Sequence, residues 1–74
     1  MRIEFFEPDS INNYYPIIKV EIIDDNWINR HTLCIAVKAT RERYDGTERY
    51  DEFYLFNKVT LVDHLHRCKI NLEK

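Results

Sequence analysis

Alternating apolar and polar residues predict strands in the first third of the chain. Residues 1–5 alternate with a period of two, as a half-buried strand does. Residues 7–10, Glu-Pro-Asp-Ser, interrupt this pattern, and residues 11–16 are typical of a loop or a short turn. The alternation returns over residues 17–23, where β-branched side chains share one face. We therefore expect strands over residues 1–5 and 17–23.

Two further strands are expected in the middle of the chain. Residues 24–26, Asp-Asp-Asn, form a turn signal, and Trp27 and Ile28 fall in the connection that follows it. A long strand is predicted over residues 31–44, with an apolar face that consists of Leu33, Ile35, Val37 and Ala39. Its partner is predicted over residues 47–56.

The dipeptide Asp45-Gly46 is the strongest hairpin signal, because a type I′ turn needs positive φ at both of its central residues. A two-residue loop there sets the register between the flanking strands. It pairs Arg43 with Glu48, Glu42 with Arg49, Thr40 with Asp51 and Val37 with Tyr54. A shift by one residue would place like charges opposite each other, which is destabilising. The sequence therefore predicts the register as well as the hairpin.

After Phe56 the apolar positions change to helical spacing. They are Leu61, Val62, Leu65, Cys68 and Leu72. The segment Thr60–Asp63 resembles a capping box, and Asn57 is an alternative cap. The pattern predicts an α+β fold in the order β-β-β-β-α. A small antiparallel sheet of about four strands would carry one C-terminal helix packed on one face, as a single compact domain over residues 1–74.

The composition excludes several kinds of site. Gly46 is the only glycine, whereas loops that bind phosphate groups need several glycines where the backbone approaches the ligand. The only serine, Ser10, is not in the turn motif of a serine hydrolase. The net charge of −2 provides no strong field toward nucleic acid or an anionic membrane. This charge is unevenly distributed, since residues 1–29 are acidic and residues 30–50 are basic.

No apolar run approaches the length of roughly 20 residues that spans a bilayer. Acidic residues also interrupt the N-terminal segment where a signal peptide has its apolar region. These features favour the cytoplasm, where Cys34 and Cys68 are expected to be free thiols.

Two clusters could in principle support chemistry. His64 and Cys68 are four residues apart and would share a helix face, but the local ligand pairs of a zinc site are missing. His31 follows Asp24 and Asp25, yet no nucleophile or oxyanion donor lies near them in sequence. We therefore expect no catalytic residue, no metal, no cofactor and no enzymatic activity.

The most informative surface is the far end of the predicted hairpin. Its apolar alternation runs out at Ala39, so this end is expected to project into solvent. Arginine and tyrosine are enriched at the energetically important positions of protein interfaces. The candidate partner-binding residues are Arg41, Arg43, Tyr44, Arg49, Tyr50 and Trp27. A solvated ribbon held in register by its own ion pairs is the competing interpretation. Tyr14, Tyr15 and Trp27 fall in connections, where they would cap the sheet or form a contact patch.

These observations favour a non-enzymatic protein-binding module that acts by covering the surface of a larger protein. Small domains of this kind are common among inhibitors of host proteins encoded by phages and mobile elements, anti-CRISPR proteins included. One alternative is a nucleic-acid-binding sheet, because three strands followed by a helix is the layout of AP2 and integrase arm-binding domains. The other is a small oligomerising assembly subunit, and a homodimer is a related expectation.

Overall fold

A computed structural model describes residues 2–7 and 14–73. Residues 8–10 of the predicted break at 7–10 and residues 11–13 of the predicted loop at 11–16 lie outside this range. Five strands are present: β1 (Arg2–Phe6), β2 (Ile17–Asn29), β3 (Thr32–Glu42), β4 (Arg49–Asn57) and β5 (Lys69–Glu73). The described residues contain no helix, so the fold is all-β and the α+β prediction is wrong.

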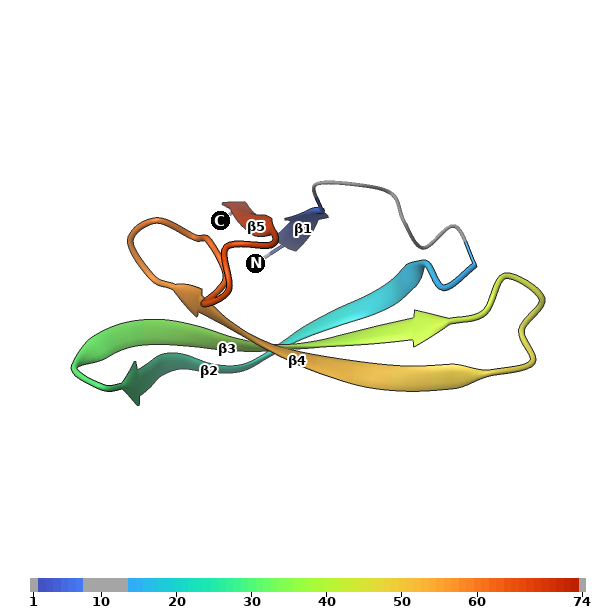
Figure 1. The fold of residues 1–74 in the computed structure, drawn as a ribbon, viewed down its shortest axis with the longest axis horizontal. Helices are drawn as coiled ribbons and strands as arrows, with labels where there is room; N and C mark the ends of the chain where they lie inside the picture. Colours follow the sequence, from blue (N-terminus) through green and yellow to red (C-terminus); the bar gives the residue numbers. More distant parts are fainter. Residues whose placement is uncertain (1, 8–13, 74) are drawn as a thin grey trace.

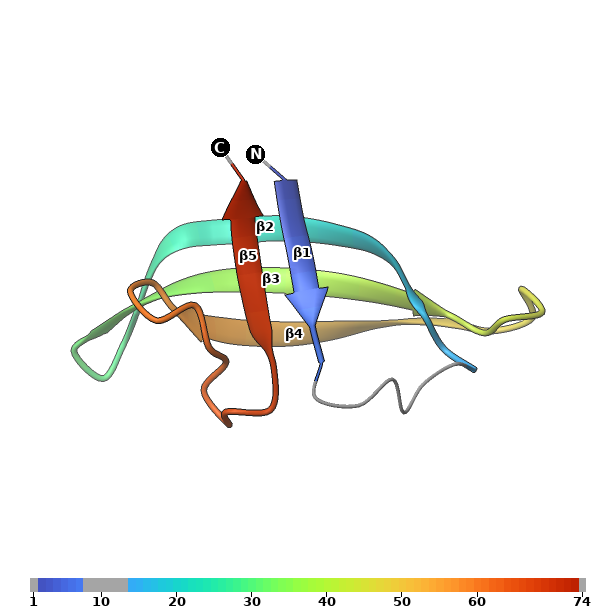
Figure 2. The same cartoon turned by 90° about the horizontal axis from the view of Figure 1, so that it is seen from above.

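The strands form two antiparallel sheets. The chain-order neighbours β2, β3 and β4 make a three-stranded sheet, while the terminal strands β1 and β5 pair with each other. Figure 1 shows the terminal pair lying above the long sheet, and Figure 2 shows that it runs across the long strands. Both chain ends therefore lie on one side of the molecule.

The core lies between the two sheets. Its buried residues are Ile35, Val37, Ala39, Tyr54, Phe56, Cys68 and Ile70. Phe5 of β1 packs edge-on against the ring of Tyr54 at 5.2 Å and that of Phe56 at 5.4 Å, measured between ring centroids. Such aromatic contacts stabilise more than the buried area alone. The terminal sheet thus replaces the predicted helix as the cover of the apolar face.

The register of the β3–β4 hairpin is confirmed, but its turn differs from the prediction. Val37 pairs with Tyr54, and Glu42 pairs with Arg49, as expected. The strands stop before Asp45-Gly46, and the N–H of Gly46 donates to the carbonyl of Arg43 at 2.7 Å. Within this loop only Gly46 has a positive φ, at 75°, so a type I′ turn is excluded. The loop between the strands, residues 43–48, is longer than the predicted two-residue loop. It extends by two residues on each side of Asp45-Gly46, so the predicted pairing of Glu42 with Arg49 is kept.

Strand β2 continues through residues 24–26, so the turn predicted there is wrong. Irregularities in its pairing with β3 lie at Ile22/Asp24 and Asp24/Trp27, so the acidic segment is accommodated by bulges. The true turn is at Arg30 and His31, with φ of 48° and 69°. These are the signs that a type I′ turn requires, here without glycine or asparagine. Trp27 and Ile28 consequently belong to a strand.

The segment between β4 and β5 forms a series of turns in place of the predicted helix. The side-chain oxygen of Asn57 accepts hydrogen bonds from the N–H groups of Val59 and Thr60, at 2.8 and 3.0 Å. Leu61 and His66 have positive φ, which ends any helical path. Isolated bridges pair Phe56 with Asp63 and Val62 with Lys69, and so connect β4 to the beginning of β5. Leu65, placed on the apolar face by the helical pattern, is 65% exposed.

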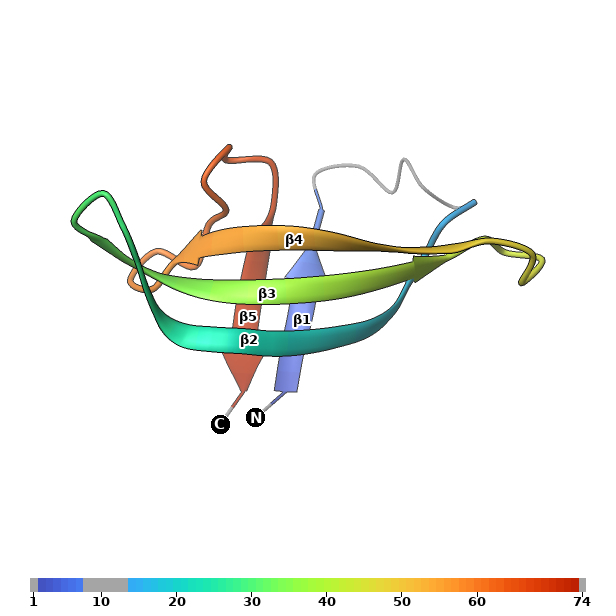
Figure 3. The same ribbon diagram turned by 90° about the horizontal axis from the view of Figure 1, so that it is seen from below.

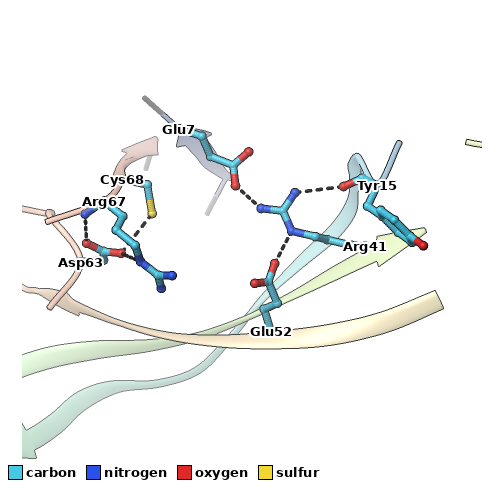
Figure 4. Close-up of polar contacts among 7 residues, drawn as sticks. All are labelled: Glu7, Tyr15, Arg41, Glu52, Asp63, Arg67 and Cys68. Atoms are coloured by element: carbon cyan, nitrogen blue, oxygen red, sulfur yellow. Dashed lines mark hydrogen bonds and ion pairs between the residues drawn. The ribbon is translucent and has the colours of Figure 1, made fainter. Parts of the chain in front are cut away.

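A buried carboxylate organises the end of this segment. Asp63 is 3% exposed and accepts a 2.6 Å hydrogen bond from the N–H of Arg67. Its other oxygen accepts from the Cys68 thiol at 3.5 Å (Figure 4). The Arg67 guanidinium lies 3.5 Å from the same carboxylate. Asp63 thereby fixes the direction in which the chain enters β5.

Alkaline titration of Cys68 tests this packing. Burial and, secondarily, the charge of Asp63 raise the pKa of the Cys68 thiol from 9.0 to about 12. A neutral thiol favoured by the fold contributes stability below pH 9, and this is lost as the pH rises toward 12. We expect Cys68→Ala to lessen the alkaline fall in unfolding free energy by up to about 1.4 kcal/mol per pH unit. Urea titrations of both proteins between pH 8 and pH 11 measure it, and parallel pH profiles would contradict it.

Candidate functional site

Arg41 is a buried ion rather than a surface residue. It follows Ala39 on the inward face of β3 and is only 3% exposed. The expectation that the hairpin end projects into solvent is therefore wrong at this position. The inward face continues beyond its last apolar residue because the end of β1 and the segment before β2 cover it (Figure 4).

The guanidinium of Arg41 joins four parts of the chain. Its Nη2 donates to the carboxylate of Glu7, just after β1, and its Nε donates to Glu52 of β4. Its Nη1 donates to the backbone carbonyl of Tyr15 at 3.0 Å. Figure 4 shows these three contacts radiating from one side chain. We call Arg41, Glu7, Glu52 and the Tyr15 carbonyl the arginine cluster.

Hydrogen bonding in the cluster offsets the cost of burying the charge. Burial by itself would lower the pKa of Arg41, but interactions with Tyr54, Glu52 and Glu7 raise it above its ordinary value. The guanidinium therefore stays protonated whenever the protein is folded. Because its partners come from segments distant in sequence, the cluster can form only in the assembled fold.

The arginine cluster positions the backbone before β2 against the hairpin end. The N–H of Tyr44 donates to the carbonyl of Tyr14 at 2.7 Å, and that of Glu42 donates to Pro16 at 3.2 Å. These bonds extend the sheet beyond β2 and set tyrosines side by side. The ring centroids of Tyr14 and Tyr44 are 5.7 Å apart.

A second aromatic pair lies at the same end of the ribbon. The rings of Tyr15 and Tyr50 are 5.4 Å apart, and the Tyr15 hydroxyl donates to Glu48 at 2.7 Å. That hydrogen bond raises the pKa of the Tyr15 phenol. The Arg43 guanidinium lies 5.8 Å from the centre of the Tyr44 ring. We call Tyr14, Tyr15, Arg43, Tyr44 and Tyr50 the tyrosine end.

The tyrosine end is exposed but held in place. Tyr14 and Tyr44 are each 64% exposed, and Tyr50 is 40% exposed. Arg43 is also 3.4 Å from the carboxylate of Asp45. The Thr47 hydroxyl, and to a lesser degree the Thr47 N–H and Arg43, lower the pKa of Asp45. The surface therefore offers aromatic rings and hydroxyls together with a locally compensated charge.

The structure divides the predicted partner-binding residues among separate places. It brings Arg43, Tyr44 and Tyr50 to the tyrosine end and buries Arg41 beside its cross-strand partner Tyr50. Arg49 lies on the other face of the ribbon, 2.7 Å from Glu42. Trp27 lies near the opposite end of the long sheet, opposite Cys34. The aromatic residues of the loop before β2 complete the surface, in line with one interpretation of their position in sequence.

The sequence indicates neither of the two carboxylates of the arginine cluster, Glu7 and Glu52. Glu7 precedes Pro8 in a segment that reads only as a strand end. Its partner Arg41 is 34 residues away along the chain. A lone acidic residue carries no sequence signal for such a pairing, so only the three-dimensional arrangement reveals it.

Neither cluster proposed for chemistry is assembled in the described part of the chain. His31 lies in the β2–β3 turn, and His64 is exposed while Cys68 is buried. Residues 2–7 and 14–73 hold no group of three or more potential ligands placed to bind a metal ion. Cys34 and Cys68 are both free and buried. Within the same residues no helix has the length and apolar character needed to cross a membrane.

Comparison with known proteins provides no relative. No protein-family model matches the chain, and searches of curated proteins and of solved structures find no similar protein.

Replacing Arg41 tests the arginine cluster. Arg41→Met keeps much of the side-chain volume but leaves the carboxylates of Glu7 and Glu52 without their shared cation. Breaking a buried ion pair by removing one partner typically costs about 3–5 kcal/mol. We expect a loss of that size in urea unfolding, enough to leave part of this small protein unfolded in water.

Arg43→Met is the matched control, because the Arg43 side chain is 42% exposed and its ion pair with Asp45 is open to solvent. We expect it to change stability by about 1 kcal/mol or less. If both variants lose the same small amount, the arginine cluster does not stabilise the fold.

Proposed function

We propose that this chain is a non-enzymatic protein-binding module that contacts its partner through the tyrosine end. The observation that carries the proposal is the exposure of Tyr14 and Tyr44, 64% each, as a pair of rings in contact next to the segment that the arginine cluster holds through the Tyr15 carbonyl. Tyrosine provides a large contact area with a hydroxyl for directional bonding, and it loses little conformational entropy on binding. A surface already ordered before contact gives up less freedom when a partner docks.

The mode of action that we propose is occlusion of a surface on a larger protein, in the cytoplasm. Inhibition of a host protein by a phage or mobile-element product fits this mode and this size. Occlusion requires no catalytic group, only a rigid surface that excludes the natural partner. The backbone bonds of Tyr44 and Glu42 to the segment before β2 support such rigidity.

The arginines favour a protein partner over nucleic acid. Arg41 is buried, Arg43 lies beside Asp45, and Arg49 lies beside Glu42. Phosphate contacts need cations directed at the ligand, and here each of these three is engaged by carboxylates. The strand-and-helix layout that supported a nucleic-acid-binding sheet is also absent, since β4 is followed by turns.

Capture from a lysate of the source cell tests the proposal. The immobilised wild-type chain should retain a protein after nuclease treatment. The double variant Tyr14→Ala with Tyr44→Ala should bind that protein at least about tenfold more weakly, since residues of this kind at an interface centre contribute about 2 kcal/mol each.

Val59→Ala is the control, because Val59 is 91% exposed on the β4–β5 segment, away from the tyrosine end. It should bind like the wild type, and circular dichroism should show that every variant is folded. Retention that disappears with nuclease, or equal binding by the double variant, would argue against the tyrosine end as a protein-binding surface.

A further inference from the structure

The face of the long sheet turned away from β1 and β5 is apolar at one end. Figure 3 views the molecule from this side, with β2, β3 and β4 in front of the terminal pair. A hollow of about 430 Å³ on this face is lined by Ile23, Trp27, Ala36, Phe53 and Leu55, among others. The lining includes no charged side chain. We call these five residues the tryptophan groove.

Large side chains of the tryptophan groove are unusually open to solvent. Phe53 is 69% exposed, Ile23 50% and Trp27 44%, although Ala36 beneath them is only 7% exposed. Exposed apolar residues are unremarkable singly, but a contiguous group on one rigid sheet is typical of an interaction site. The groove contains no residue of the tyrosine end, so the proposed function does not account for its exposed apolar side chains.

The polar half of the same face is already satisfied within the chain. Glu21 lies 3.6 Å from Lys19 and 3.5 Å from Lys38. Thr40 donates to Asp51 at 2.8 Å. These contacts leave the apolar half as the part of the face on which a partner gains most by docking.

The border of the groove is acidic. On β2, Asp24 and Asp25 lie between the groove residues Ile23 and Trp27, and on β4, Asp51 lies two residues before Phe53. These three carboxylates form no ion pair with the residues that the structure describes. Two lysines lie near the groove: Lys38, the cross-strand partner of Phe53, is 3.5 Å from Glu21, and Lys58 donates to the side chain of Asn26 at 2.8 Å. Asp24 and Asp25 accept hydrogen bonds only from the neutral groups of Asn26. The groove therefore combines an apolar floor with three carboxylates at its border that accept hydrogen bonds from neutral groups but form no salt bridge within the described residues.

We infer that the tryptophan groove is a second docking surface, and that it binds a protein segment carrying apolar side chains flanked by lysine or arginine. Apolar side chains would fill the hollow beside Trp27 and Phe53, and the cations would lie against the carboxylates of the border. Opposite charges around an apolar centre give such a contact its selectivity. The hollow is lined by none of the residues of the tyrosine end, so this proposal does not depend on the proposed function.

Charge also distinguishes this occupant from a second copy of the chain. A copy docked face to face would add its own Asp24, Asp25 and Asp51 to the same contact. Like charges in close contact disfavour association. A basic segment converts the same border into a favourable contact.

Trp27 makes the inference measurable, because it is the only tryptophan in the chain. Two synthetic peptides serve as probes: one alternates leucine with lysine, and the other alternates leucine with glutamate. We expect the leucine–lysine peptide to shift the Trp27 emission to shorter wavelength and to bind at least about tenfold more tightly than the glutamate peptide.

Two variants separate the apolar and electrostatic contributions. Phe53→Ser should weaken binding of the lysine peptide severalfold without changing the charge of the protein. Asp24→Asn with Asp25→Asn should reduce the preference between the two peptides. The Tyr14→Ala, Tyr44→Ala variant should bind the lysine peptide like the wild type, so that failure at one surface is distinguishable from failure at the other.

Three results would overturn the inference. They are the absence of binding by the lysine peptide, equal binding of the two peptides, and binding that Phe53→Ser leaves unchanged. Light scattering adds a fourth: a dimer that forms without peptide and shifts the Trp27 emission would assign the groove to a second copy.

Discussion

Burial of one guanidinium determines how the rest of this small protein is arranged. Alternation along β3 directs Arg41 inward with Val37 and Ala39, so its charge must be compensated away from water. The compensation comes from Glu7, Glu52 and the carbonyl of Tyr15, which belong to three other segments. The end of β1, the segment before β2 and the β3–β4 ribbon therefore converge on one side chain. A buried cluster of this kind need not increase stability over an apolar core, but it admits few alternative packings. The exposed tyrosines take their positions from it.

Local pairing rules were sufficient for the central hairpin and insufficient for its turns. The pairing of Val37 with Tyr54 and of Glu42 with Arg49 follows from charges and alternation that are visible in sequence. The turn at Asp24–Asn26 was predicted from residue preferences, yet the strand runs through it with bulges. The chain reverses instead at Arg30 and His31, both at positive φ although neither is glycine or asparagine. The residue preferences of a turn give way where pairing along a long strand favours another position.

The missing helix shows why apolar spacing is ambiguous near a chain end. Leu61 and Cys68 do face the core, as the helical pattern required, but they reach it from successive turns. Their spacing is satisfied by a path that Asn57 and Asp63 fix through side-chain hydrogen bonds to the backbone. Only part of the candidate site could be predicted from the sequence. Arg43, Tyr44 and Tyr50 are close in sequence and share one hairpin, whereas Glu7 and Arg41 are joined only by the complete fold.

The exposed aromatic residues have an energetic implication for a protein of this size. Burying a phenylalanine side chain is worth about 1.5–3 kcal/mol, a large share of what a core of this size supplies. Phe53 and Trp27 nevertheless contribute their side chains to the outer face, where Phe53 is 69% exposed. The inner face closes without them, because Phe5 and Ile70 cover Tyr54 and Phe56 from the terminal sheet. Folding and the docking that we propose thus use opposite faces of the same strands, because β3 and β4 bury one set of side chains and expose the other. A partner that covers the outer face recovers the hydrophobic free energy that the isolated chain forgoes, and it does so without rearranging the core.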